Sequence, residues 1–196
     1  MTESTKEYEY LKVRISELKV SFNFEQADGE MTKPQEDQLK GFQLLCHAEL
    51  EDYFESIALR IFDESVAKWR SERNANYQLA SYFIEQDRLA LSADSFTKSM
   101  QLVNQYNQNI IKKNHGIKEQ NIKKMYEPLG YSIDDFDSVL LSELNSFGSQ
   151  RGESAHKSKK HTQTQLDKNN VYSEVDRIVE LISGFEEVIR SRFFQL

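Results

Sequence analysis

The chain is poor in the residues that interrupt regular structure. It has 7 glycines and 2 prolines among 196 residues, well below their usual share. So few breakers leave room for few turns, which argues against sandwiches, barrels and glycine-rich nucleotide-binding folds, and favours long helices. Cys46 is the single cysteine, which excludes an internal disulfide and a cysteine-based zinc cage. We therefore expect a reducing, cytoplasmic compartment.

Long apolar runs and an excess of positive charge are also absent. The longest apolar run is about four residues, too short to cross a membrane, and the polar start of the chain has no apolar region of the signal-peptide type. Lys and Arg number 25 against 32 Asp and Glu, a net charge of −7. This is the wrong sign for a tight nucleic-acid binder, so any nucleic-acid site must be a local basic patch.

Apolar residues spaced three or four apart predict helices along most of the chain. The first helix runs to about Glu25, where Ser4 and Glu7 match a capping box. The second starts after Pro34 and ends in the polar stretch 71–76. The segment 77–91 fits a short helix and a turn. Further helices are predicted from Ser95 to about 114, over 118–126, from Asp134 or Asp135 onward, and from Asn169 or Asn170 to the C-terminal end. The prediction is all-α: an up-and-down bundle of about five main helices, in a single domain 1–196 with a polar loop at about 157–170.

One arginine stands where an apolar residue is expected. Leu140, Leu144 and Phe147 form a stripe whose next position is Arg151, and His156 follows five residues later. An arginine holds phosphate, and an imidazole moves protons near neutral pH, so the pair suffices for metal-free RNA cleavage. On a straight helix the two positions lie about 140° apart, so they converge on one phosphate only if the helix breaks at Gly152 or a second subunit contributes. The alternative is a helix end where both side chains bind the last carbonyls.

The segment Arg-Gly-Glu-Ser-Ala-His at 151–156 resembles the R-x4-6-H motif of the HEPN family. The earlier segment 46–53, Cys-His-Ala-Glu-Leu-Glu-Asp-Tyr, is similar to a helix of HEPN proteins of the RiboL-PSP type, and the resemblance covers roughly residues 35–190. It implies an all-helical domain, a homodimer and a metal-independent endoribonuclease of a prokaryotic toxin–antitoxin or anti-phage defence system, without a cofactor. Arg151 would then hold the scissile phosphate, and His156 would act as general base. Two positions depart from many toxin members: Gly152 follows the arginine, and Ser158 stands where some have tyrosine.

Other polar residues are candidates to support this motif. Glu49, Glu51 and Glu153 are predicted to orient the arginine or the histidine, with ordinary surface pairing as the alternative. Lys157, Lys159, Lys160 and His161 directly follow the motif and are predicted to contact RNA phosphates. A second basic cluster comprises Lys112, Lys113, Lys118, Lys123 and Lys124.

Competing site types are less well supported. Glu153 and His156 match one Glu-x-x-His of a di-iron bundle, but such a site needs a second copy, and no other histidine has a glutamate three places earlier. His47 and Glu49 match a deaminase His-x-Glu, but the paired cysteines that motif requires are missing. We therefore expect no metal. A non-catalytic helical module that binds a protein or RNA partner stays open, favoured by Gly152 and the acidic balance.

Overall fold

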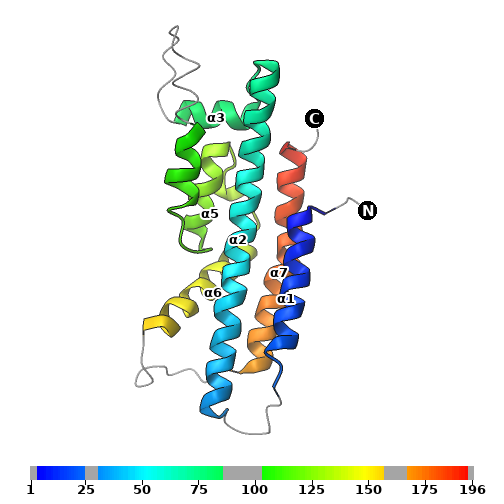
Figure 1. Cartoon of the computed structure of the whole chain (residues 1–196), viewed down its shortest axis with the longest axis vertical. Coiled ribbons are helices and arrows are strands. Elements are labelled where there is room, and N and C mark those ends of the chain that lie inside the picture. Colours follow the sequence, from blue (N-terminus) through cyan, green and yellow to red (C-terminus); the bar gives the residue numbers. More distant parts are fainter. Residues whose placement is uncertain (1–3, 25–30, 86–102, 157–166, 194–196) are drawn as a thin grey trace. The chain divides into compact units, whose positions relative to one another are not determined.

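The computed structural model describes residues 4–24, 31–85, 103–156 and 167–193 (Figure 1). For residues 151–156 it describes the backbone and not the side chains. Within these ranges every regular element is a helix and none is a strand, which confirms the predicted all-α class. The α-helices are α1 (Lys6–Ser21), α2 (Lys33–Glu72), α3 (Tyr77–Glu85), α5 (Glu119–Tyr126), α6 (Ser138–His156) and α7 (Lys168–Phe193). The short elements are a π-helix, η1 (Asn107–Ile111), and two 3-10 turns, η2 (Glu127–Leu129) and η3 (Ile133–Asp135).

The chain divides into two compact units. Unit 1 comprises Met1–Tyr53, Gly116–Lys118 and Phe136–Leu196, and unit 2 comprises Phe54–His115 and Glu119–Asp135. The helix α2 contributes to both, up to Tyr53 in unit 1 and from Phe54 in unit 2. The single domain over residues 1–196 stays a prediction, and the two units are described one at a time.

In unit 1, α1 runs antiparallel to the first part of α2. Tyr8 near the start of α1 packs against Tyr53, with ring centroids 6.2 Å apart, and Phe22 just after α1 packs against Phe42 at 6.3 Å. Each of the two helices buries its apolar residues that are spaced three or four apart, because such residues share one helix face. Figure 1 shows α1 and α7 lying beside this part of α2.

The helices α6 and α7 complete unit 1 and are also antiparallel. Gln150 bonds to Glu174, while Arg177 pairs with Glu143 at 3.2 Å, so the two sequences run in opposite directions along the contact. Gln43 of α2 bonds to Gln150, and His47 stacks on Phe147, which makes α6 antiparallel to α2 as well. Unit 1 is therefore an up-down-up-down arrangement of α1, α2, α6 and α7.

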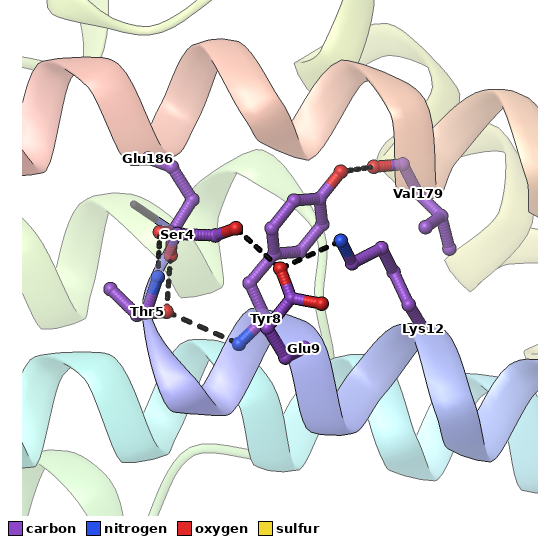
Figure 2. A network of polar contacts seen from close by, with 7 residues as sticks. All are labelled: Ser4, Thr5, Tyr8, Glu9, Lys12, Val179 and Glu186. Atoms are coloured by element: carbon purple, nitrogen blue, oxygen red, sulfur yellow. Dashed lines mark hydrogen bonds and ion pairs between the residues drawn. The ribbon is translucent and has the colours of Figure 1, made fainter. Parts of the chain in front are cut away.

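A buried carboxylate ties three of these helices together. Glu186 of α7 is 1% exposed. It accepts hydrogen bonds from the Thr5 N–H at 3.0 Å, the Thr5 hydroxyl at 2.8 Å and the Tyr53 hydroxyl at 2.6 Å. Thr5 is the N-cap of α1, and its hydroxyl also accepts from the Tyr8 N–H (Figure 2). A negative charge at the start of α1 interacts favourably with the helix dipole.

Unit 2 is built around stacked aromatic rings. Phe62 of α2 stacks on Tyr106 at 4.1 Å and meets Tyr82 of α3 edge-on at 5.2 Å. The Tyr106 hydroxyl is buried and donates to the carbonyl of Met125 in α5 at 2.9 Å, so its polar group is satisfied. The contact joins the segment before η1 to α5.

Several predicted boundaries were wrong by a few residues. Thr5, not Ser4, caps α1, and α1 ends at Ser21 instead of about Glu25. The helix α7 begins at Lys168, one or two residues before the predicted start, and the Asp167 carboxylate accepts from the Asn170 N–H. Neighbouring polar residues have similar capping preferences, so packing decides among them.

The helix predicted from Ser95 is described only in its second half. Residues 103–106 are α-helical, and the chain then widens into the π-helix η1. The first part of the predicted helix, and almost all of the predicted polar loop at 157–170, lie outside the described residues.

Candidate functional site

The helix α6 carries the arginine–histidine motif. It begins after Asp137, whose carboxylate accepts from the Val139 N–H at 2.7 Å. The predicted start at Asp134 or Asp135 was wrong, because these residues belong to the 3-10 turn η3. The predicted stripe of Leu140, Leu144 and Phe147 is buried as expected.

The helix does not break at Gly152. It continues to His156, so positions 151 and 156 lie on one uninterrupted helix, where five residues correspond to about 140° of rotation. The helix break at Gly152, one of the two ways to bring the pair together, is therefore absent, and convergence through a second subunit stays a prediction. The side chains of Arg151, Glu153 and His156, and all of Lys157, Lys159, Lys160 and His161, lie outside the described residues, so these assignments stay predictions.

A chain of polar side chains holds α6 at the residue just before the motif. The Gln43 amide donates to the Gln150 side-chain oxygen at 3.1 Å, and the Gln150 amide donates to the Glu174 carboxylate at 3.0 and 3.3 Å. Burial raises the pKa of Glu174; the Gln150 hydrogen bond opposes this, and nearby Glu143 adds to it. Three helices are thus joined by directional bonds at Gln150, which limits how α6 can rotate.

One turn earlier, a buried histidine packs against α6. His47 is 2% exposed, its ring lies 6.4 Å from that of Phe147 in a stacked arrangement, and its Nδ1 is 3.6 Å from a Glu51 oxygen. The other Glu51 oxygen accepts from the Gly116 N–H at 2.6 Å. Through these contacts, His47 and Glu51 join α2 to α6 and to Gly116 within unit 1.

Glu49 faces a different helix. Its carboxylate pairs with Arg14 of α1, with nitrogen–oxygen distances of 3.2 and 3.3 Å. The described contacts of Glu49 thus join α2 to α1, and those of Glu51 join α2 to Gly116. Their predicted support of Arg151 or His156 stays a prediction.

Sequence patterns did not single out Gln43, Gln150 or Glu174. The available signal was polar residues beside apolar stripes: Gln43 lies four residues before His47, and Gln150 three residues after Phe147. Such residues are costly to bury without hydrogen-bond partners, so a polar residue at the edge of a stripe indicates a polar contact with another helix.

No group of three or more metal-ligating side chains occurs among the residues that the structure describes. The described helices also include none with the length and apolar character needed to cross a membrane.

Comparison with known proteins gives one match. The family model described as RiboL-PSP-HEPN matches residues 9–191, which takes in most of both units. No curated protein and no solved structure matches the chain.

Proposed function

Since the chain belongs to the RiboL-PSP-HEPN family, we propose that it is a metal-independent endoribonuclease. The observation that carries the proposal is the motif Arg-Gly-Glu-Ser-Ala-His at the end of α6, within the residues that match the family. The three-helix polar contact at Gln150 supports it, because a phosphate-binding arginine acts best from a well-positioned helix.

The proposed reaction uses the RNA's own 2′-hydroxyl as nucleophile. His156 removes the proton from this hydroxyl, and the oxygen attacks the neighbouring phosphorus. Arg151 binds the phosphate oxygens and stabilises the added negative charge in the transition state. The bond to the 5′-oxygen breaks, and this oxygen takes up a proton from a general acid. The products are a 2′,3′-cyclic phosphate and a 5′-hydroxyl.

The general acid in this scheme is His156 of the partner subunit. On the uninterrupted helix, positions 151 and 156 are about 140° apart, so one chain does not direct both side chains to the same phosphate. In a homodimer with two facing motifs, the second chain supplies the missing group. We place the activity in the cytoplasm, in a toxin–antitoxin or defence system with a partner protein that restrains it. Light scattering should show a dimer at micromolar concentration, and a monomer would rule out the shared site.

The direct test is cleavage of total RNA in EDTA, with product ends determined chemically. Arg151→Ala and His156→Ala should each lower the cleavage rate by about 10²-fold or more. Arg60→Ala is the matched control, because Arg60 is a partly exposed arginine paired with Glu64 within α2 at 2.8 Å, and it should cleave as the parent does.

Cleavage by His156→Ala at the parental rate would refute the assigned chemistry. A parent protein that binds RNA and leaves it intact would favour the non-catalytic module instead.

A further inference from the structure

We propose that Lys112, Lys113, Lys123 and Lys124 form a binding surface for the phosphodiester backbone of RNA. We call these four residues the lysine face. They belong to unit 2, whereas the motif helix α6 belongs to unit 1. The choice of RNA as the ligand rests on the proposed function, but binding is measurable without cleavage.

The fold brings the two lysine pairs together. Lys112 and Lys113 follow the π-helix η1, and Lys123 and Lys124 lie in the last turn of α5. The Lys124 ammonium donates to the carbonyl of Lys113 at 3.3 Å, across eleven positions of sequence. All four residues are exposed.

A buried asparagine fixes this arrangement. Asn114 is 3% exposed. Its amide donates to Glu55 of α2 at 3.0 Å, and its oxygen accepts from Asn121 of α5 at 2.9 Å. Asn114 directly follows Lys113, and Asn121 lies one turn before Lys124. The backbone that carries the lysines is therefore held by satisfied buried hydrogen bonds, which keep their spacing constant.

The positive charge of the lysine face is only partly neutralised within unit 2. Lys123 pairs with Glu127 at 3.5 Å. Lys113 and Lys124 bond to uncharged oxygens, those of Asn109 and of the Lys113 backbone. Among the described residues, Lys112, Lys113 and Lys124 form no ion pair, although the chain has 32 acidic residues. Grouped cations repel one another, and a polyanion relieves this repulsion.

An RNA backbone fits this chemistry. Lysine ammonium groups on flexible stems bind phosphates as point charges and read no bases. A protein with a net charge of −7 can bind RNA only where positive charge is gathered locally. The lysine face meets this condition with exposed groups from two elements.

The experiment is fluorescence anisotropy with a labelled single-stranded RNA about 20 nucleotides long, in which every 2′-hydroxyl is methylated to prevent cleavage. The Lys113→Gln/Lys124→Gln variant removes two charges from the lysine face. The matched control is Lys12→Gln/Lys33→Gln, which removes two half-exposed lysines paired with Glu9 and Asp37. Lys124→Arg tests whether charge alone is needed.

The expected results follow from counterion release. The face variant should bind about tenfold more weakly at low salt, and the slope of log K against log salt should fall by roughly 1.4, which is about 0.7 for each lost phosphate contact with a single strand. The control should stay within about twofold of the parent. Lys124→Arg should bind as the parent does. Circular dichroism should show all variants folded, because the changed side chains are exposed.

Three results would overturn the proposal: no salt-dependent RNA binding by the parent, equal losses in the face variant and the control, or displacement of the RNA by poly-glutamate at equal charge concentration. The last result would indicate an acidic protein as the ligand. The proposed nuclease activity is judged separately. A parent that binds the methylated RNA through the lysine face and leaves unmodified RNA intact would refute only the nuclease.

Discussion

Replacing Glu186 by alanine removes a carboxylate that α1, α2 and α7 share. The Thr5 N–H, the Thr5 hydroxyl and the Tyr53 hydroxyl then lose the Glu186 oxygens to which they donate, while the Thr5 hydroxyl still accepts from the Tyr8 N–H. A buried donor without a partner costs about 1–3 kcal/mol. Removing a desolvated charge returns part of that cost. We therefore expect Glu186→Ala to lower the free energy of unfolding by about 3 kcal/mol.

Two further variants separate charge from hydrogen bonding. Glu186→Gln keeps an acceptor for the Thr5 N–H, and its amide can donate to both hydroxyls, so its cost should be about 1 kcal/mol or less. Tyr53→Phe removes one of the three donors and should cost about 1–1.5 kcal/mol. In Glu186→Ala/Tyr53→Phe the Tyr53 hydroxyl is absent and only the two Thr5 donors lose the carboxylate, so the double variant should lose about 1 kcal/mol less than the sum of the single variants.

The assay is urea unfolding followed by circular dichroism, with a check that the denaturant slope is unchanged. A cost below about 1 kcal/mol for Glu186→Ala would refute the reasoning, because it would mean that the buried donors find other partners. Equal costs for Glu186→Gln and Glu186→Ala would also refute it, since the charge itself would then be responsible.

Three other predictions follow from single positions. Because burial raises the pKa of Glu174 above its ordinary 4.5, the folded protein takes up the Glu174 proton more readily than the unfolded chain, so this group's contribution to stability is lost as the pH rises through and above 4.5. Glu174→Gln should therefore gain stability relative to the parent between about pH 4.5 and 7, measured by urea unfolding; a constant difference would contradict this. Gly130 has a φ of +82°, so Gly130→Ala should cost about 1–2 kcal/mol. Gly184 lies in α7 with open space at its Cβ, so Gly184→Ala should stabilise the protein by about 0.5–1 kcal/mol. Thermal melts in which Gly130→Ala is the more stable of the two variants would contradict both expectations. Cys46 is fully buried, and burial raises the pKa of its thiol, so it should react with a disulfide reagent only in urea; rapid reaction of the native protein would contradict its burial.

Helix-forming segments and their buried faces were predictable from the sequence. The stripe of α7 is an example, because its apolar residues are spaced three or four apart and all of them are buried: Val171, Val175, Ile178, Ile182, Phe185, Ile189 and Phe193. This worked because side-chain direction repeats every 3.6 residues, so local spacing alone specifies one face. Boundaries were less predictable. Asp134, Asp135 and Asp137 are equally good caps by residue type, and α6 starts after the last of them, next to Phe136, which stacks on Phe185 at 4.8 Å.

The motif at 151–156 was also visible in the sequence, since its arginine and histidine are five residues apart and its resemblance to the HEPN family depends only on order along the chain. The contacts at its base were not visible. More than a hundred positions separate Gln43 from Gln150, and an undescribed segment lies between Gln150 and Glu174. A polar residue beside an apolar stripe does not reveal which residue it will bond to. The lysines of the lysine face were visible as a basic cluster, but the sequence did not show that Asn114 bonds to both α2 and α5 beside them. The sequence by itself thus determined which residues form helices and which face each helix buries, because these depend on neighbours a few positions away. Only the tertiary structure decided which polar groups meet across helices, because that depends on how separate elements pack.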